Sequence, residues 1–267
     1  YGARASYIGG ASGTATVLAG QMFGIPVGGT MAHSWVMYYK DEYEAFKNYA
    51  VNYPDNTVLL VDTYDTMQSG VPNAIRVAHE VLEPMGKRLK GIRIDSGDLA
   101  YQSVRVRKML DEAGLADCRI IVSNSLDEHT ISSLNTQKAC IDSYGVGERL
   151  ITGATSDYSD DTLALLGAVY KIAAVEENGV FTPRIKISGT VEKITNPGLK
   201  KVYRIYDQNG KAKADLIAKA DEEIDMSTPF RFVDPNMPWR NLKFTGCTAK
   251  PLQIKIFENG KRVYELP

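Results

Sequence analysis

Between residues 24 and 147 the chain repeats one pattern: a short apolar run, a small or acidic cluster, and then a longer amphipathic stretch. The apolar runs are short and rich in β-forming residues, which is typical of strands buried in a parallel sheet. We predict these strands at 57–61, 90–94, 119–122 and 139–144, with a further candidate at 25–27. We predict helices at 34–49, 72–89, 100–113 and 127–138, the third followed by Gly114 as its C-terminal glycine.

Strands that alternate with helices indicate βαβ units and a parallel sheet, so the fold class is α/β. Units of this length fit part of a (β/α) barrel or a doubly wound sheet. The chain contains neither G-x-G-x-x-G nor G-x-x-x-x-G-K-[ST]. The missing motifs disfavour a dinucleotide-binding fold and a P-loop fold, and we therefore favour the barrel.

After residue 153 the pattern becomes β-rich. We expect a last short helix at 162–166, strands at 168–175, 181–187 and 201–206, and a proline-punctuated loop at 229–238. Three Asn-Gly pairs flanked by β-formers predict hairpin turns at 178–179, 209–210 and 259–260. The predicted domains are a partial α/β barrel, residues 1–167, and a β-rich C-terminal region, residues 168–267, that contributes to a second domain.

The composition is that of an average globular protein, with 44% hydrophobic and 24% charged residues. A net charge of −1 disfavours a nucleic-acid or anionic-membrane partner, either of which would select a basic excess. Cys118, Cys140 and Cys247 are too far apart for a zinc motif and indicate reduced thiols in a cytoplasmic protein. We find no signal peptide and no apolar run near the roughly 18 residues of a membrane span. Because the first residue is Tyr1, we expect an N-terminal segment to be missing.

Two pairs of acidic residues directly follow predicted strands: Asp62 with Asp65, and Asp95 with Asp98. Burying a carboxylate at such a position costs desolvation free energy unless a ligand compensates it. Sugar hydroxyls, or Mg²⁺ that carries phosphates, would be suitable ligands. Helix N-capping is the structural alternative. We favour capping for Asp98 and a ligand-binding role for Asp62 and Asp95.

The histidines differ in their surroundings. His33 follows a glycine-rich strand end in GGTMAH, where it is a candidate general base or phosphoryl acceptor, although composition alone fits a structural histidine equally well. His79 lies within a predicted helix and His129 near a helix start, so we assign both to the surface or to capping.

Other polar clusters at strand ends suit anions. Gly145 and Gly147 would let the backbone approach a phosphate, although ordinary loops contain such turns too. Thr14, after Gly13, would either bind an anion or cap the next helix. Arg93 is a candidate partner for a phosphate or carboxylate, with a strand-end salt bridge as the alternative.

These segments together resemble the nicotinate phosphoribosyltransferase family, in an order and spacing that hold over nearly the whole chain. The resemblance is carried by YIGGASGT at 7–14, GTMAHSWV at 29–36, VDTYDT at 61–66, IRIDSGDL at 92–99, SNSLDE at 123–128, YGVGERL at 144–150 and KISGTVEKITNPGLKKVYR at 186–204.

The resemblance implies a type II phosphoribosyltransferase fold, which is an irregular (β/α) barrel with a second domain, and a homodimer. It implies that nicotinate displaces diphosphate from 5-phosphoribosyl 1-diphosphate, giving nicotinate mononucleotide for NAD biosynthesis. ATP as co-substrate and Mg²⁺ as cofactor are implied as well, whereas the metal ligands stay unknown.

The same resemblance implies roles for individual residues. It makes His33 the residue phosphorylated by ATP and gives Asp95, with Arg93 beside it, the ribose and phosphate contacts, while Asp62 matches the carboxylate of the family's DxYD motif. The residues expected to bind substrate or phosphate are Thr14, Thr30, Arg93, Ser96, Gly97, Asn124, Ser125, Asp127, Gly145 and Gly147.

Two departures from the family pattern bear on activity. An arginine-rich motif expected just before Tyr1 is absent, and GTAT at 13–16 lacks the asparagine or serine often found after GT in relatives. We therefore expect the 267-residue chain alone to be inactive.

Three alternatives are open at this point. Relatives that use nicotinamide or quinolinate share much of the pattern. A metabolite-binding barrel without turnover is the second, although His33, Asp62 and Asp95 argue against it. An aldolase or isomerase barrel is the third and is disfavoured, because no predicted strand ends in a Schiff-base lysine.

Overall fold

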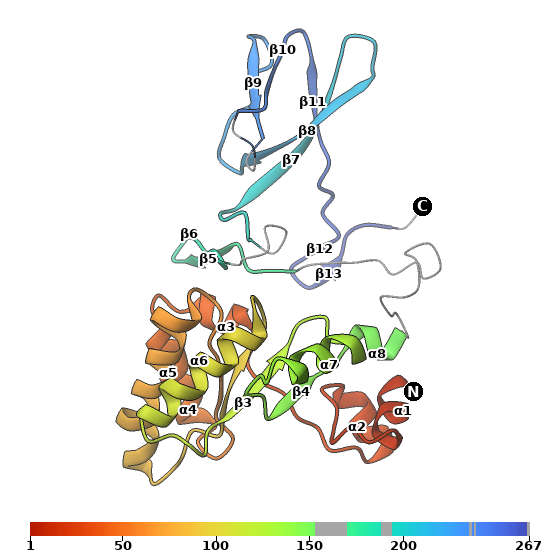
Figure 1. Cartoon of the computed structure of the whole chain (residues 1–267). Coiled ribbons are helices and arrows are strands. Elements are labelled where there is room, and N and C mark those ends of the chain that lie inside the picture. The colour runs from red at the N-terminus through yellow and green to blue at the C-terminus, as the bar shows by residue number, and fades with distance from the viewer. Residues whose placement is uncertain (153–169, 188–193, 235–236, 238, 266–267) are drawn as a thin grey trace. The chain divides into compact units, whose positions relative to one another are not determined.

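The computed structural model describes residues 1–152, 170–187, 194–234, 237 and 239–265. The chain divides into two compact units (Figure 1). The first comprises residues 1–175 and 184–196, and the second comprises residues 176–183 and 197–267. The expected domain boundary between residues 167 and 168 and the expected helix at 162–166 lie outside the described residues.

The first unit contains a parallel sheet and the helices that alternate with its strands. In chain order its elements are α1 Gly2–Ile8, α2 Val17–Phe23, α3 His33–Tyr38, α4 Glu42–Asn52, β1 Val58–Leu60, η1 Thr66–Gly70, α5 Val71–Val77, η2 Ala78–Leu82, η3 Glu83–Met85, β2 Gly91–Ile94, α6 Leu99–Glu112, β3 Arg119–Ser123, α7 Glu128–Thr136, β4 Ser143–Gly145 and α8 Glu148–Thr152. None of the described helices is both long and apolar enough to cross a membrane.

The sheet confirms the predicted parallel pairing of four strands. Its order is β1-β2-β3-β4, so each strand lies beside its neighbour in sequence. The fourth strand begins at Ser143, later than the predicted 139–144, and the candidate at 25–27 contributes only an isolated bridge between Val27 and Thr14. The sheet therefore has the βαβ connectivity that the alternating pattern indicates, and within the described residues it comprises these four strands.

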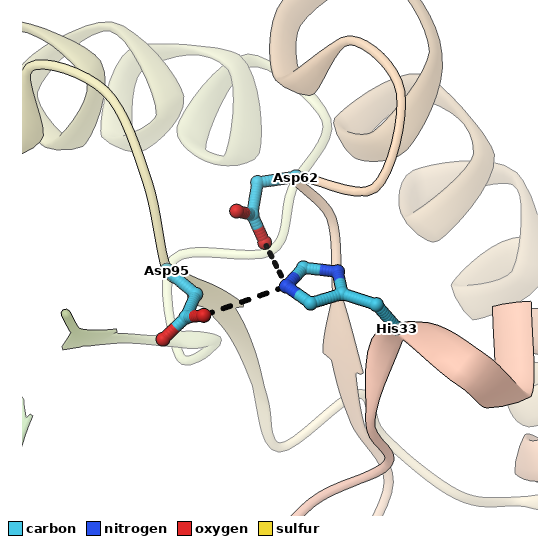
Figure 2. A group of neighbouring side chains, drawn as sticks. All are labelled: His33, Asp62 and Asp95. Atoms are coloured by element: carbon cyan, nitrogen blue, oxygen red, sulfur yellow. Dashed lines mark hydrogen bonds and ion pairs between the residues drawn. The ribbon is translucent and has the colours of Figure 1, made fainter. Parts of the chain in front are cut away.

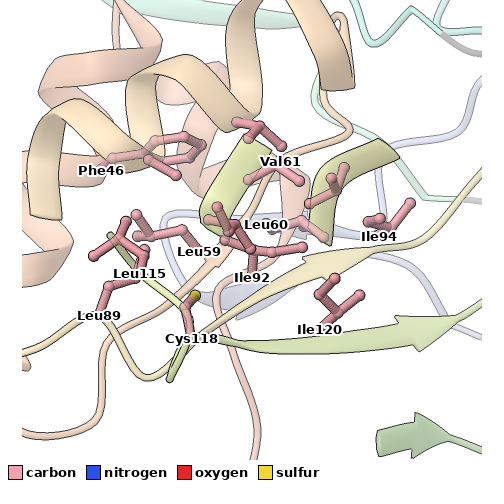
Figure 3. Packing of buried hydrophobic residues seen from close by; sticks show 14 of the residues in the cluster. Phe46, Leu59, Leu60, Val61, Leu89, Ile92, Ile94, Leu115, Cys118 and Ile120 are labelled. Atoms are coloured by element: carbon pink, nitrogen blue, oxygen red, sulfur yellow. The ribbon is translucent and has the colours of Figure 1, made fainter. Parts of the chain in front are cut away.

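The core lies where the sheet meets its helices (Figure 3). Strand residues Leu59, Ile92 and Ile120 are fully buried, as is Phe46 of α4. In β1, β2 and β3 buried apolar residues line both faces of the sheet and exclude water from it, whereas Arg93 of β2 and Ser123 of β3 are polar residues near the carboxyl ends of their strands. Gly70 of η1 packs closely against the backbone that follows β1, since a Cβ at this position would lie 1.9 Å from the carbonyl oxygen of Val61.

The helices agree with the predictions where a capping residue marks their start. Asp98 and Asp127 cap α6 and α7 by accepting hydrogen bonds from Tyr101 N and Thr130 N. The predicted helix at 34–49 is instead divided into α3 and α4, because the Asp41 carboxylate accepts a bond from Glu44 N and starts a new helix.

The helix predicted at 72–89 begins and ends earlier than expected. Asp65 caps its first turn, so the helical segment starts at Thr66 in η1. It continues through α5, η2 and η3 and ends at Met85, because Gly86 takes the left-handed conformation with φ 67°. The C-terminal glycine predicted after α6 is confirmed, with Gly114 at φ 73°.

The second unit is antiparallel and β-rich, as predicted. Its strands, with β5 running into it from the first unit, are β5 Ala174–Glu177, β6 Val180–Pro183, β7 Lys200–Tyr206, β8 Ala212–Lys219, β9 Phe230–Val233, β10 Asn241–Phe244, β11 Thr248–Pro251, β12 Phe257–Glu258 and β13 Lys261–Arg262. The order β11-β7-β8 forms one sheet, and the remaining strands form two-stranded ribbons.

The three Asn-Gly turns are confirmed as hairpin connections: β5 to β6, β7 to β8, and β12 to β13. At Asn178-Gly179 and Asn259-Gly260 both residues have positive φ, which suits a type I′ turn. The predicted loop at 229–238 is wrong for Phe230–Val233, which is β9. Phe232 makes edge contacts with Phe230 and Phe244, and this aromatic packing forms a strand despite the flanking prolines.

A buried carboxylate fastens α4 to the segment behind the strand ends. Glu42 accepts hydrogen bonds from the Ser69 hydroxyl and from Asn73 Nδ2, at 3.1 Å for Asn73. Its second oxygen, Oε1, is buried and accepts no hydrogen bond from the described residues. Burial raises the pKa of Glu42 above its ordinary value of 4.5, and the bonds from Ser69 and Asn73 offset that rise only in part.

The raised pKa of Glu42 makes the stability of the protein depend on pH. The folded protein holds the proton more tightly than the unfolded chain, so the stabilisation is complete below about pH 4.5 and is lost as the pH rises through the folded-state pKa. We predict that, as the pH rises through the folded-state pKa, the wild-type protein loses free energy of unfolding relative to the Glu42→Gln variant. The total loss should be roughly 1.4 kcal/mol for each unit by which folding raises the pKa of Glu42.

Urea denaturation of both proteins between pH 4.5 and 8 measures this difference. The Gln variant is the matched control, because it keeps an acceptor for Ser69 and Asn73 and cannot ionise. A difference that stays constant over this pH range would contradict the prediction.

Candidate functional site

Three polar side chains meet at the carboxyl ends of β1 and β2 (Figure 2). His33 is the first residue of α3, Asp62 comes two residues after β1, and Asp95 directly follows β2. His33 Nε2 lies 3.4 Å from Asp95 Oδ2 and 3.8 Å from Asp62 Oδ1. Both carboxylates therefore lie close to the same ring nitrogen of His33.

The register of the two strands brings the carboxylates together. Leu60 of β1 pairs with Arg93 of β2, and Val61 N donates to Arg93 O at 3.0 Å. Because the strands are parallel neighbours, the residues that follow them leave the sheet at the same edge. Asp62 and Asp95 are thus side by side, as the sequence predicts, and His33 contacts them from the start of α3.

The other nitrogen of the His33 ring faces a hydroxyl group. His33 Nδ1 lies 3.1 Å from Thr63 Oγ1, and both residues are buried. A carboxylate only accepts hydrogen bonds, so Nε2 carries the ring proton and Nδ1 carries the lone pair that accepts from the Thr63 hydroxyl. The carboxylates thereby set the tautomer, and the contact with Thr63 helps to hold the orientation of the ring.

A network of donors holds Asp95 in its charged form. Arg93 Nη2 donates to Asp95 Oδ1 at 3.2 Å, and the Ser123 hydroxyl donates to the same oxygen. Burial alone would raise the pKa of Asp95, but the bonds from His33 and Ser123 and the charge of Arg93 outweigh it and hold the pKa well below its ordinary value. Arg93 also donates to Thr30 Oγ1 at 2.8 Å and to Ser123 Oγ at 2.9 Å.

Asp62 is buried more deeply and has different partners. Ser96 Oγ donates to Asp62 Oδ2 at 2.5 Å, and Lys186 Nζ lies 3.6 Å from the same oxygen. Asp62 Oδ1 is buried and accepts no hydrogen bond from any described residue. Of the predicted site residues, His33, Asp62, Asp95, Arg93, Thr30 and Ser96 therefore form one connected cluster.

The predicted loop residues after β3 and β4 surround the same sheet edge. Asn124 and Ser125 both have positive φ, 109° and 49°, which is strained for residues other than glycine and is frequent at functional sites. Gly145 ends β4, where a Cβ would lie 3.2 Å from the Cβ of Ser123. Gly147 immediately precedes α8.

Asp127 and Thr14 both accept hydrogen bonds from nearby backbone amides. The bonds from Thr130, together with Arg149, lower the pKa of Asp127 to about 2, in agreement with its position as the cap of α7. Thr14 Oγ1 accepts from Thr16 N at 3.0 Å, beside the start of α2. The N-cap residue of α2 is Thr16, so this bond lies just before the helix and is not a side-chain cap of its first turn. No described hydrogen bond joins Thr14 to His33.

The residues assigned to capping or to the surface have those positions. Asp98 caps α6 as predicted, and Asp65, for which neither role was favoured, caps η1. His79 is exposed and pairs with Glu83 at 2.9 Å, and His129 is exposed beside Glu128. Gly97 is in the turn after β2 with φ 80°, a conformation that favours glycine.

Three further residues belong to the cluster and were not predicted from the sequence: Thr63, Ser123 and Lys186. The first two stand next to predicted positions at strand ends, so the strand pattern contained a signal for them. Lys186 is about 120 residues from its partner in the chain, and its burial at 2% exposure depends on tertiary structure. No local pattern distinguishes it from a surface lysine.

Fold and site together define an α/β protein with a polar, charge-balanced site at the carboxyl ends of parallel strands. The profile of the nicotinate phosphoribosyltransferase (NAPRTase) family matches residues 6–213, and that of the nicotinate phosphoribosyltransferase C-terminal domain matches residues 199–267. The chain belongs to the nicotinate phosphoribosyltransferase family.

Individual relatives agree with this assignment. The nicotinate phosphoribosyltransferase of Bacillus subtilis is 50% identical over 270 residues, covering 100% of this chain and 53% of the relative. That of Dictyostelium discoideum is 36% identical, covering 99% of this chain and 52% of the relative. The chain spans about half the length of the curated relatives that it matches.

A solved structure matches the fold. The crystal structure of nicotinate phosphoribosyltransferase from Porphyromonas gingivalis superposes with a TM-score of 0.54 at 22% identity. The match covers 69% of this chain and 48% of that one. At this identity the match supports the fold alone.

Proposed function

We propose that the protein containing this chain is a nicotinate phosphoribosyltransferase that joins nicotinate to 5-phosphoribosyl 1-diphosphate and hydrolyses ATP in the process. The products are nicotinate mononucleotide and diphosphate, in NAD biosynthesis. Membership of the family and 50% identity to the Bacillus subtilis relative support the substrates. The observation that carries the proposal is the placement of His33 Nε2 between Asp62 and Asp95 at a parallel sheet edge.

The geometry supports separate roles for the two nitrogens of His33. Nε2–H faces two carboxylates, so Nδ1 is the nitrogen with a free electron pair for a phosphoryl group once the Thr63 hydroxyl rotates away. The bond from Nδ1 to the γ-phosphorus forms while the bond from that phosphorus to the bridging oxygen breaks, and ADP leaves with the electron pair. Asp62 and Asp95 stabilise the positive charge that develops on the ring, and water later hydrolyses the phosphohistidine.

The second reaction needs electrostatic control at the ribose. The ring nitrogen of nicotinate bonds to the anomeric carbon while diphosphate departs with the electrons of the broken C–O bond. Positive charge develops on the sugar in this step, and the ionised Asp95 is suited to stabilise it. We assign ribose and phosphate contacts to Arg93, and phosphate contacts to the loops of Asn124 to Asp127 and Gly145 to Gly147.

Mg²⁺ fits the chemistry of these donors. Asp62 and Asp95 offer carboxylate oxygens, which Mg²⁺ prefers to imidazole nitrogen, and Asp62 Oδ1 is a buried acceptor without a hydrogen bond in the described part of the chain. Asp62 and Asp95 would hold the ion, and phosphate oxygens of the substrate would complete its coordination. The ion would neutralise charge on the departing diphosphate.

We further propose that the parallel sheet belongs to an irregular (β/α) barrel of the type II phosphoribosyltransferase kind in a cytoplasmic homodimer. The order β1-β2-β3-β4 supports a barrel, because strand order does not reverse as it does in a doubly wound sheet. Size-exclusion chromatography with light scattering of the complete protein tests the dimer.

Product formation from nicotinate, nicotinamide and quinolinate, each with and without ATP, tests the activity. We expect nicotinate mononucleotide as the main product and a higher affinity for nicotinate when ATP is present. A protein that binds these substrates without turnover, or that prefers another base, would overturn the proposal.

Asp95→Ala should lower kcat/KM roughly ten- to a hundredfold, which corresponds to the loss of a charge-assisted hydrogen bond of about 1.5–3 kcal/mol. The fold should persist, because Asp95 lies beyond the strand end and serves the ligand. Steady-state kinetics and thermal denaturation of the complete protein measure both effects. Asp98→Ala is the matched control: it removes the cap of α6, costs about 1 kcal/mol of stability and should retain turnover. An Asp95→Ala protein with normal kcat/KM would refute this role.

His33→Ala should abolish ATP hydrolysis and the ATP-dependent gain in nicotinate affinity, because the phosphoryl acceptor is gone. A slow transfer without ATP should remain, since Asp95 and Arg93 still face the ribose. With γ-labelled ATP, the wild-type protein should carry acid-labile, base-stable label on the peptide that contains His33. The control is His79→Ala, which removes an exposed histidine paired with Glu83. Label on another residue, or stimulation of the His33→Ala protein by ATP, would exclude the role.

A further inference from the structure

Lys186 is a buried cation beside the proposed phosphoryl acceptor, and the family motifs assigned it no role. Its residue exposure is 2%, which makes it one of the largest fully buried side chains of the described chain. Burial of an ammonium group costs free energy unless a negative partner compensates it. The partner is Asp62, whose side chain is also 2% exposed, at 3.6 Å between Nζ and Oδ2.

The backbone around Lys186 is held against the same strand end. Ile187 N donates to Thr63 O at 3.3 Å, and Lys186 N donates to the buried Thr195 Oγ1 at 3.4 Å. This stretch belongs to the first unit, although segments of the second unit precede and follow it in sequence. The segment around Lys186 is therefore part of the first unit and places the Lys186 ammonium group beside Asp62.

The cluster has a simple charge balance. Arg93 compensates Asp95, Lys186 compensates Asp62, and the remaining group, His33, faces one oxygen of each carboxylate. A phosphoryl group on His33 would add negative charge to the imidazole ring whose Nε2 lies 3.8 Å from Asp62 Oδ1. In a buried site such charges interact strongly, because little water screens them.

We propose that Lys186 is a positioning residue that compensates the charge of Asp62 so that His33 can accept a phosphoryl group. It acts through Asp62 and transfers no atom in the reaction. This inference rests on the proposed role of His33. Loss of Lys186 would leave Asp62 as an uncompensated buried carboxylate beside the incoming phosphate, and phosphorylation of His33 would be the step most affected.

A double-mutant cycle on the complete protein tests this role. The readouts are the initial rate of His33 labelling by γ-labelled ATP and the rate of phosphoribosyl transfer without ATP. We expect Lys186→Met to lower labelling at least about tenfold, and by more than it lowers ATP-independent transfer. Lys186→Arg should recover part of the labelling, because it keeps the charge. Lys108→Met is the matched control, since its side chain is 78% exposed on α6.

The decisive comparison is made in the Asp62→Asn background. With no carboxylate to compensate, removal of Lys186 should have little effect, so Lys186→Met/Asp62→Asn should label within about threefold of Asp62→Asn. This comparison also decides the matter if Lys186→Met alone does not fold, because the double variant removes both buried charges together.

Two results would overturn the proposal. The first is a Lys186→Met protein whose labelling falls no more than its ATP-independent transfer, which would indicate a general structural role. The second is a double variant that labels tenfold or more below Asp62→Asn, which would indicate that Lys186 acts independently of Asp62. Absence of label on His33 in the wild-type protein is a separate outcome, and it would refute the proposed function itself.

Discussion

Each carboxylate at the edge of the parallel sheet has its own cation, and the organisation of the site depends on this pairing. A carboxylate taken out of water loses several kcal/mol of hydration unless charge and hydrogen bonds replace it. For Asp95 the lost hydration is compensated by Arg93 of the preceding strand, β2. For Asp62 it is compensated by Lys186, which is distant in sequence. The donors around Asp95 hold its pKa well below its ordinary value, although the carboxylate is partly buried next to a histidine.

The arrangement explains how an ordinary histidine becomes suited to phosphoryl transfer. Thr63 orients Nδ1, and Asp62 and Asp95 lie on the Nε2 side, so the ring has one proton-bearing face and one face with a lone pair. The positions of these groups follow from the sheet. Because β1 and β2 are parallel neighbours, the residues that follow them lie together at the carboxyl ends of the strands. The close-packed hydrophobic core supports these strand ends.

Much of the fold followed from local pattern. The runs at 57–61, 90–94 and 119–122 became strands because a two-sided buried strand has a distinctive apolar composition. Helix ends were less predictable. Asp41 interrupts the helix expected at 34–49, and the aromatic contacts of Phe232 form β9 in a proline-rich stretch, since capping and side-chain packing outweighed the average propensity of each window.

For the site, the sequence by itself determined that Asp62 and Asp95 follow neighbouring strands and that Arg93 lies on one of them, because strand period and chain order place them there. His33, which we predicted just after a strand end, is instead the first residue of α3. The sequence determined neither the pairing of His33 with Thr63 nor the burial of Lys186 against Asp62. Those contacts join segments separated by 30 to 124 residues, and their energy depends on distance and on exclusion of water. Only the tertiary structure decides such contacts. The sequence specifies which side chains can carry a charge, but their burial and their neighbours, which set the strength of the interaction, depend on the fold.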